Sequence, residues 1–355
     1  MKAAVYRGID DVRVEEVATP TIGSKEVLVK VEACGVCGTD LKKIHLGLQT
    51  PPKIFGHETT GVIAQIGSEV VKWKLGDRVE VNHHVPCRQP DCYYCSRKIF
   101  AQCPLYKKTG VTAGFEPAGG GFAEYVRVMD WCVEGMARIP DGISFEEASF
   151  IEPLNTCLKG VRSAGIQAGD TVFILGQGPI GMLFTRLAHL AGAKTVVTDR
   201  FESRRKTALS IGADAALDPE ADIRKSILEL SEGRGADVSI VAVPNVKVIA
   251  EALAQVRPAG KVLLFAQTRL QDLVEVDAGQ ICMNEKSLIG SYSSDFTLQD
   301  EVCELIFSRK VDVRPLITHR FPLEDIQEAI SIASHPQEGS LKAMVFPGGM
   351  SLQPS

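Results

Sequence analysis

The feature that most constrains this chain is a glycine pattern at one strand–helix junction, within the segment GQGPIG. An apolar strand, TVFILG, leads into Gly176-x-Gly178-x-x-Gly181, and a segment with apolar residues at helical spacing follows. The glycines permit a tight turn, the close approach of a pyrophosphate and close packing of helix on sheet, and the helix N-terminus offers N–H groups to phosphate. The segment therefore predicts a dinucleotide-binding turn.

An acidic residue stands where such a turn needs one. Asp199 ends the next strand, TVVTD, about 20 residues past Gly181, where a carboxylate would bond the adenosine ribose hydroxyls. Its charge repels a 2′-phosphate and favours NAD, although Arg200 and the pair Arg204-Arg205 are nearby cations that would suit NADP. We expect the dinucleotide to contact Gly176, Gly178, Pro179, Ile180, Gly181, Asp199 and Arg200.

From residue 170 onward, strands alternate with helices. TVVTD, DVSIVAV and KVLLFA are short apolar strands, and SRRKTALSI, DIRKSILEL and VIAEALAQV are helical segments between them. That alternation predicts an α/β domain with a doubly wound parallel sheet covered on both faces. We place this domain at residues 156–289.

The remaining residues, 1–155 and 290–355, are expected to form the other domain. Short strand-like runs separated by glycine turns, such as EVLVKVE and GVIAQIG, predict a β-rich, barrel-like fold. KSLIGSYS, two helical segments and a last strand, LKAMVF, contain no further nucleotide-type junction, so we return them to this domain. Residues 110–128 are expected to be a glycine-rich loop ending in a strand, residues 144–164 a helix, and residues 347–355 a frayed tail.

Possible metal ligands gather between Ala33 and Gly61. Cys37, Asp40, His57 and Glu58 supply thiolate, imidazole and carboxylate, the side-chain types that bind Zn²⁺, and an open catalytic site needs three ligands plus water. A buried Cys and a loop His are common without any metal, but the cluster together with the rest of the chain favours a metal site.

A second cysteine cluster follows, at Cys87, Cys92, Cys95 and Cys103. Four thiolates in so short a stretch predict a closed, tetrahedral zinc site that is structural rather than catalytic. The alternative is a set of unrelated thiols, and the loose first gap, Cys-x4-Cys, is the weak point of the zinc interpretation.

Composition excludes several other classes of protein. The chain has 355 residues, a formal net charge of −5 and 45% hydrophobic residues, as expected for a soluble protein of two domains. No basic stripe indicates nucleic acid, and no apolar run approaches the ~20 residues of a membrane helix. Because the N-terminus lacks an export signal, we expect a cytoplasmic protein whose ten cysteines are thiols or metal ligands.

These motifs together resemble the zinc-containing medium-chain alcohol dehydrogenase family over nearly all of residues 1 to 347. The segments that carry the resemblance are Cys37-Gly38-Thr39-Asp40, Gly56-His57-Glu58, Gly76-Asp77-Arg78-Val79, the four-cysteine lobe, and GQGPIG with Asp199. The resemblance implies a discontinuous, GroES-like catalytic domain and a Rossmann domain between its two parts. It also implies alcohol oxidation by hydride transfer to a nicotinamide, with two zinc ions per chain.

The resemblance assigns roles to single residues. Cys37 and His57 are similar to the catalytic zinc ligands. Two residues remain candidates for the third ligand. Glu152, in the segment IEPLNT, resembles the glutamate of sorbitol-dehydrogenase-like members, and Glu58 lies beside His57 in the sequence. Asp40 resembles the acid that orients the imidazole.

Proton transfer is the least settled assignment. Thr39 resembles the hydroxyl that takes the alcohol proton. Many relatives continue the relay with a histidine five residues after the zinc cysteine, but Lys42 stands there in this sequence, so we consider His45 as its substitute.

The leading hypothesis is an NAD-dependent zinc dehydrogenase acting on a secondary alcohol, above all a polyol or sugar alcohol, and assembling as a homodimer or homotetramer. Threonine or a simple secondary alcohol is the alternative substrate. A non-catalytic zinc- and nucleotide-binding protein would have lost a ligand, and none is missing. A zinc-free quinone or enoyl reductase is disfavoured by the intact Cys37, His57 and Glu152.

Overall fold

The computed structural model describes residues 1–82, 84–107 and 119–349. The chain separates into two compact units, one joining Met1–Pro153 to Ser294–Ser355 and the other comprising Leu154–Ser293. Among the described residues, no helix combines the length and the apolar character needed to cross a bilayer.

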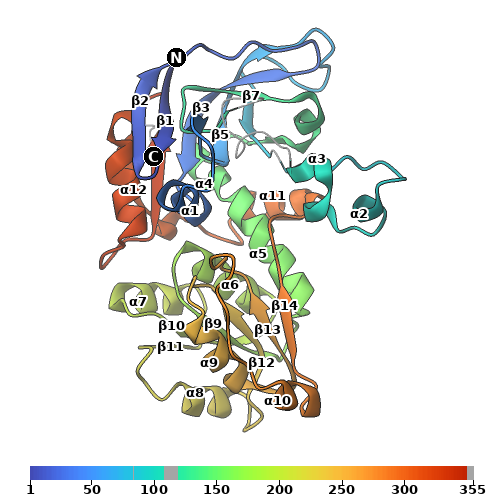
Figure 1. Cartoon of the computed structure of the whole chain (residues 1–355), viewed down its shortest axis with the longest axis vertical. Coiled ribbons are helices and arrows are strands. Elements are labelled where there is room, and N and C mark those ends of the chain that lie inside the picture. The colour runs from blue at the N-terminus through green and yellow to red at the C-terminus, as the bar shows by residue number, and fades with distance from the viewer. Residues whose placement is uncertain (83, 108–118, 350–355) are drawn as a thin grey trace. The chain divides into compact units, whose positions relative to one another are not determined.

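The unit Leu154–Ser293 is built on a six-stranded parallel sheet (Figure 1). Across the sheet the order is β11-β10-β9-β12-β13-β14. All five residues of β9 are buried, as expected for a central strand with both faces covered. The strands are β9 (Thr171–Leu175), β10 (Lys194–Thr198), β11 (Ala215–Leu217), β12 (Ala236–Val241), β13 (Val256–Leu264) and β14 (Ser287–Gly290).

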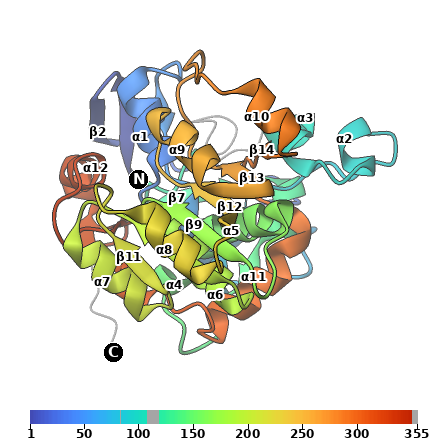
Figure 2. The same cartoon turned by 90° about the horizontal axis from the view of Figure 1, so that it is seen from below.

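Helices connect successive strands of this sheet (Figure 2). They are α6 (Pro179–Leu190), α7 (Glu202–Ser210), α8 (Ile223–Leu230), α9 (Lys247–Gln255) and α10 (Ala278–Met283). The connectivity confirms the doubly wound α/β prediction. One part of it was wrong: we returned KSLIGSYS to the other domain, yet β14 pairs in parallel with β13. β14 is the edge strand of this sheet, and an edge strand needs no nucleotide-type strand–helix junction. The lack of such a junction was therefore no reason to place KSLIGSYS in the other domain.

The other unit is β-rich. Its larger sheet has the order β15-β16-β3-β5-β6-β8, with β7 also paired to β3, and its smaller sheet has the order β2-β1-β4. The C-terminal strand β16 lies next to β3, which explains why both ends of the sequence belong to one unit. The strands are β1 (Lys2–Gly8), β2 (Asp11–Glu16), β3 (Val27–Gly35), β4 (Lys53–Ile54), β5 (Glu58–Ile66), β6 (Arg78–Glu80), β7 (Tyr125–Val128), β8 (Ala137–Arg138), β15 (Ile317–Pro322) and β16 (Lys342–Phe346).

Several helices complete the chain. They are α1 (Gly38–Leu46), α2 (Tyr93–Ser96), α3 (Pro104–Lys107), α4 (Phe145–Ser149), α5 (Ile151–Ala164), α11 (Gln299–Phe307) and α12 (Ile326–Ser334), with 3₁₀ turns at η1 (Phe100–Gln102), η3 (Asp130–Gly135), η4 (Phe296–Leu298), η5 (Arg314–Leu316) and η6 (Leu323–Asp325).

The helix expected over 144–164 is divided at Phe150. Pro153 has no N–H and cannot donate to the carbonyl of Ser149, so the hydrogen-bond ladder is interrupted there, while proline fits the first turn of α5. The strand expected at the end of 110–128 is β7. Most of the predicted loop, residues 110–118, and the end of the predicted tail, residues 350–355, lie outside the described residues.

Candidate active site

Cys37 begins helix α1 as its N-cap. Its Sγ accepts from the backbone N–H of Thr39 at 3.5 Å, and Asp40 Oδ2 accepts from the N–H of Cys37 at 3.3 Å. This capping box satisfies N–H groups that a helix start otherwise leaves unpaired. The helix start therefore fixes the cysteine and places the exposed Thr39 beside it.

Asp40 also holds His57. Its Oδ1 lies 3.1 Å from His57 Nδ1 and accepts from the N–H of Gly56 at 3.5 Å. Burial alone would raise the pKa of Asp40, but the charge of His57 and these hydrogen bonds hold it below its ordinary value. A carboxylate that fixes one ring nitrogen leaves the other for a metal, which is the usual support of a ligating histidine.

Glu58, at the start of β5, forms a buried ion pair with Lys342 of β16. Their side chains are 1% and 5% exposed. Burial disfavours the ammonium of Lys342, but Glu58 and Cys37 hold the pKa of Lys342 above its ordinary value. Gly35 makes room for the pair, because a Cβ there would lie 2.0 Å from Glu58 Oε2.

The donor atoms of Cys37, His57 and Glu58 all lie within 4.8 Å of one another. Thiolate, imidazole and carboxylate at this spacing fit zinc. Glu152 is not part of that group. It lies in the first turn of α5, with Oε1 3.7 Å from His84 Nδ1. Burial raises the pKa of Glu152 to about 7, against the charge of His57, which lowers it.

His45 is engaged elsewhere. Its Nδ1 lies 2.5 Å from Asp10 Oδ1 and its Nε2 lies 2.7 Å from Ser334 Oγ. Both ring nitrogens therefore join α1 to the β1–β2 turn and to α12. This placement argues against the relay role considered for His45.

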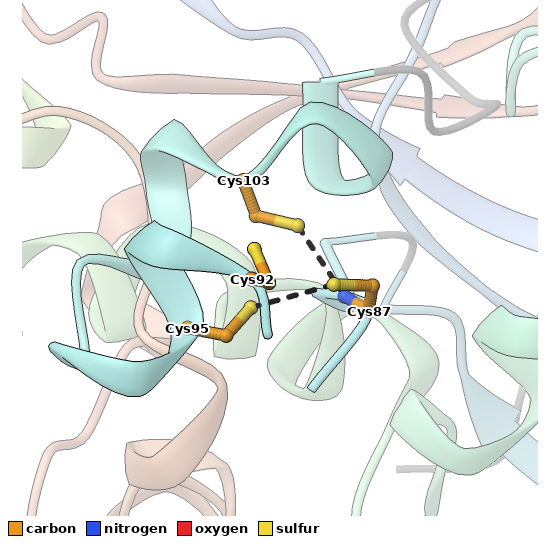
Figure 3. Close-up of side chains that lie close together, drawn as sticks. All are labelled: Cys87, Cys92, Cys95 and Cys103. Carbon is orange, nitrogen blue, oxygen red and sulfur yellow. Dashed lines mark hydrogen bonds between the residues drawn. The ribbon is translucent and has the colours of Figure 1, made fainter. Parts of the chain in front are cut away.

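The four cysteines of the second cluster converge (Figure 3). Their sulfurs lie within 4.8 Å of one another, and none forms a disulfide. Burial alone would raise the pKa of Cys103, but hydrogen bonds from the backbone of Cys87, Tyr106 and Leu105 lower it to about 7. A thiolate stabilised in this way, with three further thiols around it, fits a closed tetrahedral zinc site.

The long first gap of the cluster is a turn. Arg88 has a φ of 53°, and the N–H of Cys92 donates to the carbonyl of Gln89 at 3.1 Å. The extra residues therefore do not keep the cysteines apart. Arg88 also pairs with Glu134, and its guanidinium lies 5.3 Å from the ring centroid of Phe296.

The glycine pattern opens α6 in the parallel-sheet unit. Gly176 has a φ of 94°, which favours glycine, and a Cβ on Gly181 would lie 1.9 Å from the carbonyl oxygen of Gly176. At Gly178, the N-cap of α6, the nearest atom to an added Cβ is Arg204 Nη1, 4.0 Å away. Gly176 makes the turn, Gly181 permits close packing, and Gly178 leaves open space for a phosphate. This arrangement fits a dinucleotide.

Asp199 contacts this turn. Its Oδ2 accepts from the N–H of Gln177 at 2.8 Å, and its Oδ1 accepts from the N–H of Phe201 at 2.9 Å. Arg204 Nη1 lies 3.6 Å from Oδ2. Arg200 is exposed and lies over the ring of Phe201, 4.6 Å from its centroid.

Sequence reasoning missed Lys342 and His84. Lys342 is the one charged residue of the buried strand KAMVF, and a lysine in such a strand is a signal of a buried partner. His84 directly precedes the cysteine cluster, but nothing in its sequence context points to Glu152.

Known proteins resemble this chain over nearly its whole length. Residues 23–141 match the alcohol dehydrogenase GroES-like domain, and residues 179–308 match the zinc-binding dehydrogenase family. The chain is 32% identical to sorbitol dehydrogenase of Bacillus subtilis, covering 98% of this chain and 97% of that protein. It is 31% identical to L-threonine 3-dehydrogenase of Pyrococcus furiosus, covering 93% and 94%.

A solved structure is similar over the same length. A protein described as a zinc-binding dehydrogenase from Sinorhizobium meliloti, bound to NADP, superposes with a TM-score of 0.87 at 30% identity, covering 98% of this chain and 99% of that one. The sequence matches span both units, and the residues that carry the resemblance are all present. The chain therefore belongs to the zinc-binding alcohol dehydrogenase family.

Proposed function

We propose that this enzyme oxidises a secondary alcohol of the polyol or sugar-alcohol class to a ketone, with NAD as the hydride acceptor. The observation that carries the proposal is the convergence of Cys37 and His57, with Asp40 behind the imidazole and Glu58 and Glu152 as the two candidates for the third ligand. The similarity to a sorbitol dehydrogenase supports a polyol, and the nearly equal similarity to a threonine dehydrogenase supports threonine as the second candidate.

Two zinc ions per chain fit the donor sets. Cys87, Cys92, Cys95 and Cys103 would hold one of them. Cys37, His57 and a glutamate would hold the other. We assign Glu152 as that glutamate, because Lys342 already pairs with Glu58. Glu58 is the alternative ligand.

Zinc at the Cys37 site would act as a Lewis acid that lowers the pKa of the substrate hydroxyl. The protein residues do the rest. Asp40 fixes His57 through Nδ1, and the capping box fixes Cys37. Thr39, exposed beside Cys37, has the hydroxyl that would take the alcohol proton.

In the nucleotide site, the open space at Gly178 and the N–H groups at the start of α6 suit the pyrophosphate. The buried carboxylate of Asp199 favours NAD because it would repel a 2′-phosphate. Arg204, close to both Asp199 and Gly178, is the residue that would weaken this preference.

The direct test is a substrate panel of sorbitol, threonine and 2-butanol, with reduced nicotinamide formation followed for NAD and NADP separately. We expect the highest kcat/KM for the polyol with NAD. A preference for threonine or for NADP would overturn the corresponding assignment.

Glu152→Ala separates the two glutamates. We expect this variant to lose metal or nearly all turnover while it still binds NADH. Glu58→Ala should impair turnover but spare zinc more than Cys37→Ala does. If Glu152→Ala keeps full zinc and near-normal turnover, the ligands are Cys37, His57 and Glu58.

A further inference from the structure

Lys43, in the last turn of α1, has a partly buried ammonium without a counter-charge. Among the described residues, none forms an ion pair or a side-chain hydrogen bond with it. The contact that the structure gives its Nζ is with an aromatic face, the ring of Phe55, 5.8 Å from the centroid. Charges withdrawn from water are normally paired, so this lysine calls for an explanation.

The position of Lys43 follows from the helix that carries it. Cys37 is the N-cap of α1 and Asp40 lies in its first turn, so Lys43, three residues after Asp40, shares a face of the helix with that carboxylate. Phe55, on which the ammonium lies, is 2% exposed and stands two residues before His57. Lys43 is therefore placed beside both segments that supply the proposed metal ligands Cys37 and His57.

Negative groups of the site act on this ammonium from two elements. Burial lowers the pKa of Lys43 below its ordinary value, although the charges of Asp40, Cys37 and Glu152 raise it. Cys37 and Asp40 belong to the start of α1, whereas Glu152 belongs to the first turn of α5. The ammonium therefore lies on the side of α1 that faces the proposed metal centre.

None of these acids is available to pair with Lys43. Asp40 uses Oδ1 for His57 Nδ1 and Oδ2 for the N–H of Cys37, and Cys37 and Glu152 are the proposed zinc ligands. A lysine ammonium has three N–H donors and no acceptor, so the missing partner is an acceptor. An anionic acceptor offsets the cost of the buried charge better than a neutral one, because hydrogen bonds between ionised groups are the stronger ones.

We propose that Lys43 is a specificity-determining residue whose ammonium pairs with an anionic group of the substrate, a phosphate monoester or a carboxylate. The inference rests on the proposed oxidation of a secondary alcohol and narrows its substrate class to alcohols that also carry negative charge. A phosphorylated polyol or a sugar acid supplies the missing counter-charge. A neutral polyol or a simple secondary alcohol leaves the ammonium without one.

Three variants and three probes test the role of this charge. Lys43→Met removes the charge and keeps an unbranched side chain, and Lys43→Arg keeps the charge. Lys72→Met is the matched control, because Lys72 is exposed and also lies over an aromatic ring, with Nζ 5.1 Å from the centroid of Trp73. The probes are sorbitol 6-phosphate and gluconate against sorbitol, which has the same carbon skeleton and no charge. For each protein we would measure kcat/KM, zinc content and, on the zinc- and NADH-loaded protein, the Kd of each probe by calorimetry at low and at high salt.

We expect the wild type to prefer an anionic probe to sorbitol, and the preferred anion then identifies the group as phosphate or carboxylate. Lys43→Met should lose roughly 10- to 100-fold in kcat/KM and affinity for that probe and little for sorbitol, as expected for a lost hydrogen bond between charged groups. Lys43→Arg should recover part of the loss, and Lys72→Met should resemble the wild type. High salt should weaken binding of the anion to the wild type more than to Lys43→Met, because salt screens the attraction.

Other outcomes overturn the proposal. A wild type that binds sorbitol as tightly as both anionic probes has no use for the charge. Equal losses of all three probes in Lys43→Met, or loss of zinc from it, would show that Lys43 supports the metal centre or the transfer of protons in general. If the wild type oxidises no alcohol, the proposed function fails, but the calorimetric comparison still decides the role of Lys43.

Discussion

Lys342, on the last strand of the chain, forms a buried ion pair with Glu58, the residue directly after His57. The pair ties the C-terminal strand β16 to the start of β5, across β3. It also gives the carboxylate of Glu58 a partner within the protein, so that Glu58 and Glu152 are not equivalent candidates for the metal.

The ion pair can be broken from the lysine side. Lys342→Met should destabilise the fold by about 3–5 kcal/mol, because it leaves the carboxylate of Glu58 buried without a counter-charge. Urea unfolding of the metal-free protein measures this loss. Adding Glu58→Gln should recover much of it. If Lys342→Met alone leaves the unfolding free energy unchanged, the pair is not formed in solution.

Gly35 tests how tightly that pair is packed. In Gly35→Ala the new methyl group would lie 2.0 Å from Glu58 Oε2 and 2.7 Å from Lys342 Cε. We expect a loss of about 1–3 kcal/mol in unfolding free energy, together with weaker zinc binding at the Cys37 site. Gly8→Ala is the matched control, since an added Cβ there meets nothing within 4 Å. Equal effects of the two substitutions would contradict the packing.

We expect the four-cysteine lobe to hold a zinc ion that stabilises the fold and takes no part in the reaction. Cys92→Ser should remove one of two zinc equivalents and lower the melting temperature, because a structural zinc site contributes directly to folding. Elemental analysis and thermal unfolding are the measurements, and Cys282→Ser, at an exposed cysteine, is the control. One zinc or fewer in carefully prepared, active wild-type protein would defeat the claim of two sites.

Asp199 accepts a hydrogen bond from the N–H of Gln177 in the glycine turn and is proposed to bind the adenosine ribose, and the two roles can be tested separately. Asp199→Ala should raise the KM for NAD and reduce discrimination against NADP, since it removes ribose hydrogen bonds and a repulsive charge, each worth on the order of 1–3 kcal/mol. It also removes the acceptor for the N–H of Gln177. Asp199→Asn keeps an acceptor and loses only the charge, so it should relax cofactor choice with a smaller rise in KM. If the wild-type enzyme already prefers NADP, then Arg200, Arg204 and Arg205 outweigh the negative charge of Asp199 in the choice of cofactor.

Local pattern was enough to predict the α/β class, the glycine turn followed by Asp199, and two clusters of candidate metal-binding side chains that the structure brings together, apart from Glu152. These features depend on residues close together in sequence, or on a periodicity that persists over one element. The division of the helix at Phe150 was missed for a reason equally local, because Pro153 was read only as a favourable first-turn residue.

The sequence by itself determined which side chains could bind zinc and a dinucleotide, because spacing and residue type limit that chemistry. Only the tertiary structure decided their partners. Lys342 pairs with Glu58, and His45 contacts Ser334, and in each case the two residues lie far apart in the chain. Such contacts follow from how strands and helices pack, and packing depends on the whole set of buried surfaces rather than on any one segment.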